Sequence, residues 1–451
     1  MAFVGLTQPP VLPAQAQFIP PYELLAPCAD QAAASGAIED ASWAKEQWIS
    51  ALMGQLTPSP QATQAAFSSL LAQDPAAATE YLFQAQGAAG YIRTERMALN
   101  RAWQCATDWG TMTITVNLSK PEKDPASIAA AAKAPQLDYP RCAICKENEG
   151  FPGTASAAPR HCLRLIPLTL DGEEWYLQFS PYGYYEEHAI VLSPEHRPMN
   201  TEDATFRRLL DFCDLMPHYF IGSNADIPLV GGSILSHDHY QCGKATFPME
   251  RASSLWDFEL DGLACSWLRW PLTTLRLRGK DKQAVARLAA KINDRWSTYD
   301  DPLAGIVSER EGQRHNALTS MARKEEGFYR LDLTLRNNRT TEDYPDGLFC
   351  PKKEVHAVKR ENIGLIEVMG LAILPPRVLT LMEESLGALA GDKTLQKALS
   401  EAWPAWYDKV KNLSATEDAL REAVGQTFAL GLEQCCTLPS REAVRRFVEA
   451  I

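Results

Sequence analysis

The densest group of reactive side chains lies in residues 231 to 241, which read GGSILSHDHYQ. Two of the eight histidines of the protein stand there, His237 and His239, and Gln241 follows two residues later. Alternate residues of a strand point to the same side, so a strand over 233 to 241 would place both imidazoles on one face, about 7 Å apart. One imidazole could then ligate a metal ion while the other attacks phosphorus.

Two other interpretations of this stretch exist. A polar strand end without chemistry explains an isolated H-x-H pair best. A binuclear hydrolase signature, H-x-H-x-D-H, would need histidines at 234 and 236 if it ended at His239, and the chain has Ile234 and Ser236 there. The hydrolase interpretation therefore fails on the residues themselves.

Attack on phosphorus also requires hydrogen-bond donors for the non-bridging phosphate oxygens. The amide of Gln241 and the hydroxyls of Ser233 and Ser236 are of the right type. Gly231 and Gly232 would let backbone amides approach a phosphate, because they carry no side chain. A neutral imidazole forms a phosphoramidate that is labile enough to be consumed in a second half-reaction. The stretch thus has the groups that a two-step transfer needs.

A second candidate group is the Cys142-x-x-Cys145 pair in YPRCAICKENEG. In a reducing compartment this spacing is typical of half a zinc site or of a redox pair, and two buried, reduced cysteines are the simplest alternative. A redox pair is expected at a helix start within a βαβ pattern, which this segment does not show. Thiolates with two imidazoles would form a closed, structural zinc site. The candidate histidines are His161, His188, His196 and His237.

The elements that must position these groups can be predicted from periodicity. Residues 110 to 119 alternate with β-branched side chains and predict a strand, and EEWYLQFSPYGYYEEHAIVLSP predicts two strands around a Pro-Tyr-Gly turn. TEDATFRRLLDFCDLM predicts a helix with Thr201 as its N-cap. IPLVGGSILSHDHYQ predicts a strand, a Gly-Gly break and a second strand.

The second half of the chain repeats this style without repeating the sequence. FYRLDLTLRN and NIGLIEVMGLAIL predict strands, PRVLTLMEESLGALAG predicts a helix, and PSREAVRRFVEAI predicts a closing helix with Ser440 as N-cap. Residues 1 to 90 are rich in alanine and glutamine and predict a helical extension. We expect an α+β protein with two units, residues 91 to 250 and 251 to 451, after that extension.

Composition narrows the class of partner. The chain has 451 residues, 46% of them hydrophobic, which exceeds one ordinary domain. A net charge of -12 argues against a nucleic-acid partner, because no excess of Lys and Arg offsets phosphate repulsion. Residues 1 to 90 hold one base against seven acids, so an anion site is expected after residue 90. Without a signal peptide or an apolar run of about twenty residues, we expect a cytoplasmic protein with no membrane partner.

Seven segments occur together in one order and carry a resemblance. They are YIRTERMALNRAWQ, ITVNLSKPEKDP, YPRCAICKENEG, FSPYGYYEEHAIVL, FIGSNADIPLVGGSILSHDHYQ, LRNNRTTEDYPDGLF and KRENIGLIEVMGLAILP. From about residue 90 to about residue 378 the chain closely resembles the class II, bacterial-type galactose-1-phosphate uridylyltransferases (UTP–hexose-1-phosphate uridylyltransferases), of the histidine-triad superfamily. The resemblance implies two histidine-triad-like units of antiparallel sheet with flanking helices.

The resemblance also implies an activity. UDP-glucose and galactose 1-phosphate would give glucose 1-phosphate and UDP-galactose, in a ping-pong exchange through a uridylylated histidine. The partners would be UDP-glucose, UDP-galactose and hexose 1-phosphates, and the enzyme would be a homodimer. Two alternatives remain: a transferase or phosphorylase of the same fold that uses another nucleotide or sugar phosphate, and a zinc-stabilised nucleotide-binding protein without catalysis.

The site residues follow from this resemblance by position. In HDHYQ, His239 would be the nucleophile and Gln241 the phosphate-oxygen donor, with Asp238 where the better-known class I transferases have proline. The resemblance implies a structural zinc ion, held by the four ligands Cys142, Cys145, His196 and His237. His188 is the alternative to His196. Asn224 would touch the ribose or a phosphate.

Basic residues complete the expected site. Arg93 and Arg96, with Lys120 and Lys123, would contact phosphate, although a solvated charged face explains them as well. Arg336 and Arg339 in RNNRT would serve the sugar phosphate, with strand-end solubility as their alternative. Two departures from the family pattern are Cys242, where glycine is expected, and LFCPKKEVHAVK, which holds the single histidine His356.

Overall fold

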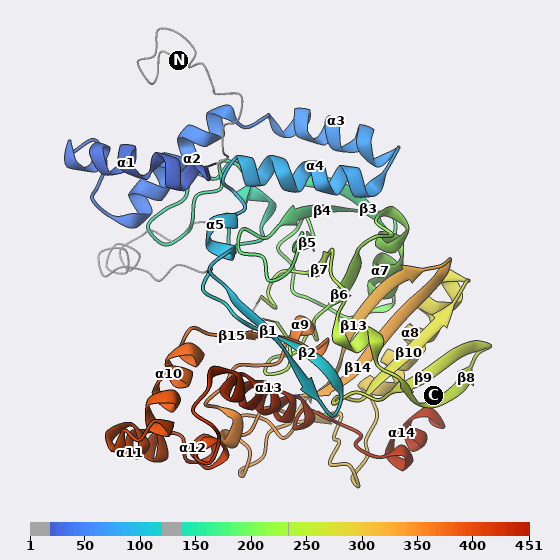
Figure 1. The fold of residues 1–451 in the computed structure, drawn as a ribbon. Helices are drawn as coiled ribbons and strands as arrows, with labels where there is room; N and C mark the ends of the chain where they lie inside the picture. The colour runs from blue at the N-terminus through green and yellow to red at the C-terminus, as the bar shows by residue number, and fades with distance from the viewer. Residues whose placement is uncertain (1–18, 120–137, 233) are drawn as a thin grey trace.

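The computed structural model describes residues 19–119, 138–232 and 234–451 (Figure 1). Its centre is a ten-stranded sheet in the order β3-β4-β5-β7-β6-β13-β14-β10-β9-β8, in which every neighbouring pair is antiparallel. The strands are β3 (Ile166–Leu170), β4 (Glu173–Phe179), β5 (Ala189–Leu192), β6 (Phe220–Ser223), β7 (His239–Gly243), β8 (Ser254–Leu260), β9 (Leu263–Leu268), β10 (Thr274–Gly279), β13 (Asn316–Glu325) and β14 (Phe328–Asn337).

The two halves of this sheet have the same topology. Three strands, β3 to β5, are followed by helix α7 (Asp203–Leu215) and by the pair β6 and β7. Strands β8 to β10 are likewise followed by α8 (Lys282–Ser297) and by the pair β13 and β14. The halves join where β6 pairs with β13, and α7 and α8 contact each other and β13. The predicted α+β fold with two antiparallel units is confirmed.

The predicted helical extension is also confirmed, and it covers the upper edge of the sheet in Figure 1. It consists of α1 (Pro21–Ala34), α2 (Ser42–Leu56), α3 (Pro60–Leu71) and α4 (Pro75–Ala88). The last two helices begin where local capping favours it: the side chains of Ser59 and Asp74 accept backbone N–H groups, and a proline follows each cap. Phe67 and Leu82 join the core of the sheet.

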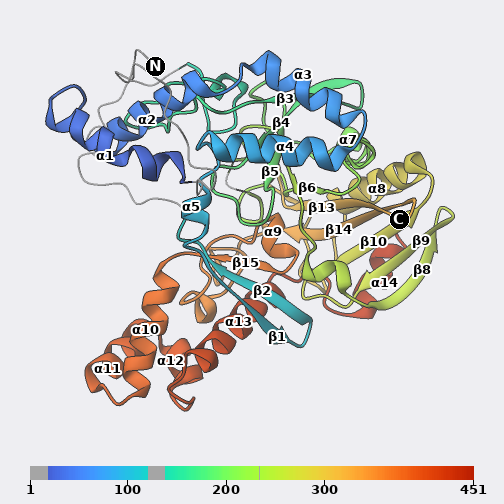
Figure 2. The same ribbon diagram turned by 45° about the horizontal axis from the view of Figure 1, so that its top comes forward.

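A second sheet and a group of helices lie below the first sheet (Figure 2). Strands β1 (Arg101–Thr107) and β2 (Gly110–Val116) are antiparallel, and β15 (Leu371–Leu374) pairs parallel to β2. The helices are α10 (Arg377–Leu389), α11 (Lys393–Ala402), α12 (Pro404–Val410) and α13 (Glu417–Glu433). The last helix, α14 (Arg441–Val448), lies apart from them, and its Val444 and Phe447 pack in the core of the first sheet. β2 belongs to the first proposed unit and β15 to the second, and the two strands pair. The division of the chain at residue 250 therefore stays a proposal.

Short elements complete the fold. They are α5 (Thr94–Met97), α9 (Leu365–Val368), η2 (Lys146–Asn148), η3 (Pro248–Arg251), η4 (Lys353–Val355), β11 (Glu309–Arg310) and β12 (Gln313–Arg314). The predicted strand over 363–374 is wrong in its first part, where the chain forms α9 before β15. Gly370 has φ +93° between the two, a conformation that glycine adopts without strain.

Two further predictions need correction. Helix α7 begins at Asp203 with Glu202 as its N-cap, not Thr201, because Glu202 and Thr205 form a reciprocal capping box. The stretch 227–238 holds no strand among its described residues, and β7 begins only at His239. Leu229 has φ 67°, and a Cβ at Gly231 would lie 2.3 Å from the Ala225 carbonyl oxygen, so the chain turns tightly here.

Candidate functional site

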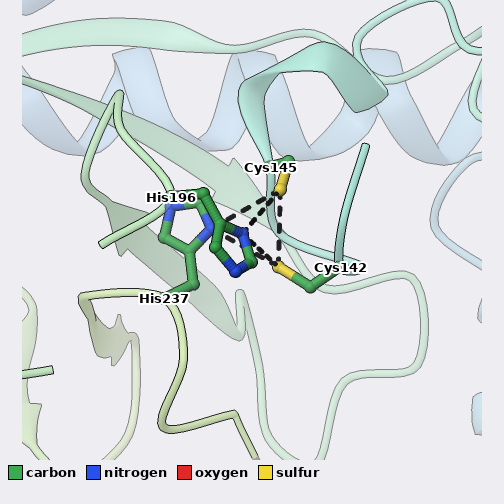
Figure 3. A group of neighbouring side chains, drawn as sticks. All are labelled: Cys142, Cys145, His196 and His237. Atoms are coloured by element: carbon green, nitrogen blue, oxygen red, sulfur yellow. Dashed lines mark hydrogen bonds between the residues drawn. The ribbon is translucent and has the colours of Figure 1, made fainter. Parts of the chain in front are cut away.

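Four side chains from three distant segments meet beside the start of β7 (Figure 3). Cys142 and Cys145 come from the loop before η2, His196 from the loop after β5, and His237 from the bend before β7. Their ligand atoms all lie within 4.8 Å of one another. The Nδ1 of His196 is 3.2 Å from Cys145 Sγ, and the Nδ1 of His237 is 3.4 Å from Cys142 Sγ. This group could hold a metal ion.

Neighbouring groups orient these side chains. The Nε2 of His237 donates to the Ser193 carbonyl at 2.9 Å, which leaves Nδ1 free to ligate. The Asn148 amide donates to the carbonyls of Cys142 and Cys145, at 2.9 Å each. Burial raises the pKa of the Cys142 thiol and lowers the pKa of His237. A divalent cation favours a thiolate and a neutral imidazole, so two sulfurs and two nitrogens fit zinc in a closed site.

The structure decides between the two candidate fourth ligands. His196 belongs to the group, whereas His188 does not. The His188 ring instead packs 4.5 Å from the Tyr185 ring, and the backbone N–H of Tyr184 donates to its Nδ1 at 3.5 Å. Burial lowers the pKa of His188 to about 4, against a smaller opposing effect of the Gln241 side chain. His188 is therefore a neutral, buried neighbour of Gln241.

His239 is the first residue of β7 and is 6% exposed. Its Nδ1 donates to the backbone carbonyl of His237 at 2.7 Å. The proton is thereby fixed on Nδ1, and the lone pair of Nε2 is left for chemistry. Burial lowers the pKa of His239 to about 4, so the imidazole is neutral near pH 7. A neutral imidazole with a fixed tautomer is the form that can attack phosphorus.

A cavity of about 710 Å³ begins at Gln241, the next residue on the same face of β7. Asn117, Tyr184 and Asn224 contribute to its wall from the N-terminal half of the chain, together with the backbone of residues 231 and 232. Residues between 359 and 376 form the opposite wall. The cavity is large enough for a nucleotide sugar and lies between the two halves of the chain.

Asn224 lines this cavity and is 2% exposed. Its Oδ1 accepts the backbone N–H of Leu365 at 2.8 Å, and a Cβ added at Gly232 would lie 2.8 Å from its Nδ2. The asparagine therefore joins the two walls of the cavity and also packs against the Gly-Gly turn. A side chain at residue 232 would have to displace the Asn224 amide.

Lys359 and Glu367 are cavity residues that the sequence did not single out. The Lys359 Nζ is 2.6 Å from Glu367 Oε1, with side chains 3% and 8% exposed. Glu367 Oε2 also accepts the Gly364 N–H at 3.3 Å. Among the described residues of the cavity wall, Lys359 is the one cation. The sequence feature that could have pointed to this wall of the cavity is the charged stretch KREN at 359–362, directly before an apolar run.

The early arginines lie elsewhere. Arg93 Nε is 2.6 Å from Glu95 Oε1, and the guanidinium stacks 3.6 Å from the centroid of the Tyr22 ring. Arg96 Nη2 is 3.3 Å from Glu46 Oε1. Neither lines the cavity, and each already has a carboxylate partner, so both hold the helical extension against the sheet. Lys120 and Lys123 lie outside the described residues.

The second pair of arginines supports the site without entering it. Arg336 is buried on β14, and both Nη atoms donate to the Ile363 carbonyl at 3.1 Å. It thereby holds the cavity wall that begins at residue 359. Arg339 Nη1 donates to the Gly305 carbonyl at 2.9 Å and does not line the cavity. Ser236 is exposed and outside the cavity wall, and Ser233 lies outside the described residues.

In the described parts of the chain, every helix is too short or too polar to cross a membrane. An α+β protein with a tautomer-fixed histidine, a Cys2His2 group and a nucleotide-sized cavity belongs to the class of enzymes that work on phosphorus. Comparison with known families identifies the enzyme family. The chain belongs to the galactose-1-phosphate uridyl transferase family, because residues 20–198 match its N-terminal domain and residues 213–402 match its C-terminal domain.

Relatives with the name galactose-1-phosphate uridylyltransferase are similar over nearly the whole chain. The Bacillus subtilis protein is 43% identical over 455 residues, which cover 97% of this chain and 88% of the relative. The Clostridium perfringens protein is 42% identical over 408 residues, which cover 88% and 82%. Among solved structures, yeast Ap4A phosphorylase Apa2 matches with a TM-score of 0.35 and 12% identity, over 71% of this chain and 92% of that one. At that score the likeness carries no weight for the site.

Proposed function

We propose that this enzyme exchanges a uridylyl group between UDP-glucose and galactose 1-phosphate, with His239 as the covalent carrier. The family and its relatives support the overall reaction. The observation that carries the role of His239 is the bond from its Nδ1 to the His237 carbonyl, which leaves Nε2 as the free nucleophile. No other described histidine combines a fixed neutral tautomer with a place on the strand beside the cavity.

In the first half-reaction, the Nε2 lone pair of His239 attacks the α-phosphorus of UDP-glucose. The bond from that phosphorus to the bridging oxygen breaks, and its electron pair leaves with glucose 1-phosphate. The Nδ1 proton stays on the ring and strengthens its bond to the His237 carbonyl as the ring gains positive charge. The Gln241 amide, on the same face of β7, donates to a non-bridging oxygen of the phosphorus under attack.

In the second half-reaction, a phosphate oxygen of galactose 1-phosphate attacks the same phosphorus. The phosphorus–nitrogen bond breaks, its electron pair returns to Nε2, and UDP-galactose leaves. Lys359 supplies positive charge in the cavity, since its ammonium has three N–H donors and Glu367 accepts one of them. The two remaining donors are available to phosphate oxygens.

We assign the Cys2His2 group to zinc. Cys142, Cys145, His196 and His237 would hold it, and with four protein ligands the bound ion would serve as a structural cross-link. We also propose that the chain forms two units, at residues 91–250 and 251–451. We further propose that the enzyme is a cytoplasmic homodimer without nucleic-acid or membrane partners.

The test is intact mass after rapid quench with UDP-glucose. The wild type is expected to gain one uridylyl group and to lose it when galactose 1-phosphate is added. His239→Ala is expected to gain none. His356→Ala is the matched control, because its ring bonds to the Pro351 carbonyl outside the cavity, and it should label like the wild type.

Two outcomes would contradict the proposal. One is a wild type that carries no adduct at saturating UDP-glucose, and the other is an adduct that persists in His239→Ala. Labelling by ADP-glucose in place of UDP-glucose would favour a transferase of the same fold with another nucleotide.

A further inference from the structure

Asp238 stands between two functional histidines and has no role in the exchange described above. It is buried, with a side chain 6% exposed. Its Oδ2 accepts the Arg197 Nε at 3.3 Å, and Arg197 directly follows His196. Asp238 directly follows His237, so this ion pair joins the residue after one metal-ligand candidate to the residue after the other.

Backbone bonds tie the same two segments together. The Asp238 N–H donates to the Arg197 carbonyl at 2.7 Å, and the Ser193 N–H donates to the Asp238 carbonyl at 3.0 Å. The loop that carries His196 is thus fixed to the strand start on both sides of Asp238. These bonds and the ion pair form one connection between the loop and β7.

The peptide unit between His237 and Asp238 links this connection to the nucleophile. Its N–H donates to the Arg197 carbonyl at 2.7 Å, and its C=O accepts the His239 Nδ1–H at 2.7 Å. Hydrogen bonds at the two ends of one peptide reinforce each other. A shift of the loop that carries Arg197 would therefore move the His237 carbonyl, which orients the ring of His239.

The free-energy cost of burying the Asp238 carboxylate argues that this residue has a role. A buried carboxylate is expensive unless it is paired and hydrogen-bonded, and an apolar residue would fill the position at less cost. Arg197 also contacts Glu173, with Nη2 3.3 Å from Oε2, and lies 5.5 Å from the centroid of the Trp175 ring. Glu173 is 46% exposed and also accepts the Arg208 Nη2 at 2.8 Å, so it contacts Arg197 at the surface of the protein.

We propose that Arg197 and Asp238 form a clamp that positions His196 against His237 for metal binding and, through the 237–238 peptide, positions the ring of His239. Both are positioning residues, because neither is among the described residues that line the cavity. The part that concerns His239 rests on the proposed function, whereas the part that concerns the metal does not.

The test uses the metal-loaded enzyme and the variants Asp238→Asn, Arg197→Gln and Arg197→Lys. Release of zinc to an excess of a chromogenic chelator is expected to be about tenfold faster or more in the first two, since such supporting groups change metal affinity by 10- to 100-fold. The rate of uridylylation in a single turnover should fall by a similar factor, with KM for UDP-glucose unchanged. Arg197→Lys keeps the charge and is expected to recover part of both losses.

Glu173→Gln is the matched control. It removes a partner of Arg197 that is itself 46% exposed, and it should leave zinc release and uridylylation within about twofold of the wild type. The double variant Asp238→Asn/Arg197→Gln should be no worse than either single one, because the two residues act together.

Wild-type zinc release in both Asp238→Asn and Arg197→Gln would overturn the clamp, and so would an equal effect in Glu173→Gln. Arg197 is 36% exposed on its side chain, so its variants decide the question if Asp238→Asn does not fold. A wild type that forms no adduct would count against the proposed function, and the zinc-release comparison would still decide the metal part of the clamp.

Discussion

At the scale of single residues, the state of His239 is set by one backbone carbonyl and by burial. The alternation of His237, His239 and Gln241 predicted a common face, but β7 begins only at His239, so only His239 and Gln241 share a face of this strand. The bond from His239 Nδ1 to the His237 carbonyl could not be predicted, because it exists only where the strand has not yet begun at residue 237. Asn224 was expected at the nucleotide, and its Oδ1 is already used by the Leu365 N–H.

Lys359 gives the clearest single-residue prediction. Replacement by methionine keeps the length of the side chain and removes the one cation among the described residues of the cavity wall. A charge-assisted hydrogen bond is worth about 1.5–3 kcal/mol, so kcat/KM for the exchange should fall roughly 10- to 100-fold. Steady-state kinetics with UDP-glucose and galactose 1-phosphate would measure it.

Two variants separate charge from folding in that experiment. Lys359→Met leaves Glu367 buried without its cation, so Lys359→Met/Glu367→Gln should regain stability but not activity. Lys353→Met, at an exposed position in η4, should leave both unchanged. Wild-type kinetics in Lys359→Met would remove the lysine from the site.

At the scale of elements, periodic segments were predictable and irregular ones were not. FYRLDLTLRN became β14 with the bounds Phe328–Asn337, and Ser440 caps α14 as expected. The strands predicted at the site were wrong in part, because the described residues of 227–238 hold no strand and residues 365–368 form α9. The conformations of these segments depend on contacts made across the fold, such as the Arg336 bonds to the Ile363 carbonyl, and a single sequence does not contain those contacts.

The attachment of α7 to the second half of the sheet rests on Asp214, and it predicts a pH dependence. Asp214 accepts Lys282 Nζ at 2.7 Å, Lys324 Nζ at 2.6 Å and the Tyr329 hydroxyl at 2.6 Å. Burial alone would raise its pKa, but these bonds outweigh burial and lower the pKa to about 2. A depressed carboxyl pKa adds stability above the unfolded value near 4, and this stability is lost as the pH falls toward 2.

Asp214→Asn should therefore lower the free energy of unfolding at pH 7 by about 1 kcal/mol, a value reduced for partial exposure to solvent. The difference from the wild type should shrink as the pH falls below about 4. Urea unfolding midpoints at pH 7, 5 and 3.5 would measure it. Asp261→Asn, in the exposed pair with Lys291, is the control and should show no difference at any pH. A constant difference across the range would assign the effect to packing.

At the scale of the whole molecule, the two halves of the sheet have the same topology but carry different side chains. One row of paired residues crosses the sheet from one half to the other: Ile190, Gln241, Gly222, Met321, Asp332 and Arg276. The row begins on β5, crosses β7 at Gln241 and ends in an ion pair, with Arg276 Nε 2.6 Å from Asp332 Oδ1. On the same face of the sheet, the N-terminal half carries His239 and Gln241, whereas the C-terminal half carries structural ion pairs. The C-terminal half also contributes one wall of the cavity.

The metal group brings the loop at 142–145 together with the segments at 196 and 237, and this leads to the last prediction. The residues at 142–145, at 196 and at 237 lie far apart in the chain, so one bound ion would cross-link three loops around β7. Metal analysis of the purified enzyme should find about one zinc ion per chain, and chelation should lower Tm by about 5 °C or more. Cys142→Ser should lose the ion and show the same lowered Tm without chelator. Cys28→Ser, at an exposed position in α1, should retain both the ion and the Tm. If chelation leaves the Tm of the wild type unchanged, the four residues are not a structural zinc site, and the Arg197–Asp238 connection alone must hold the loops in place.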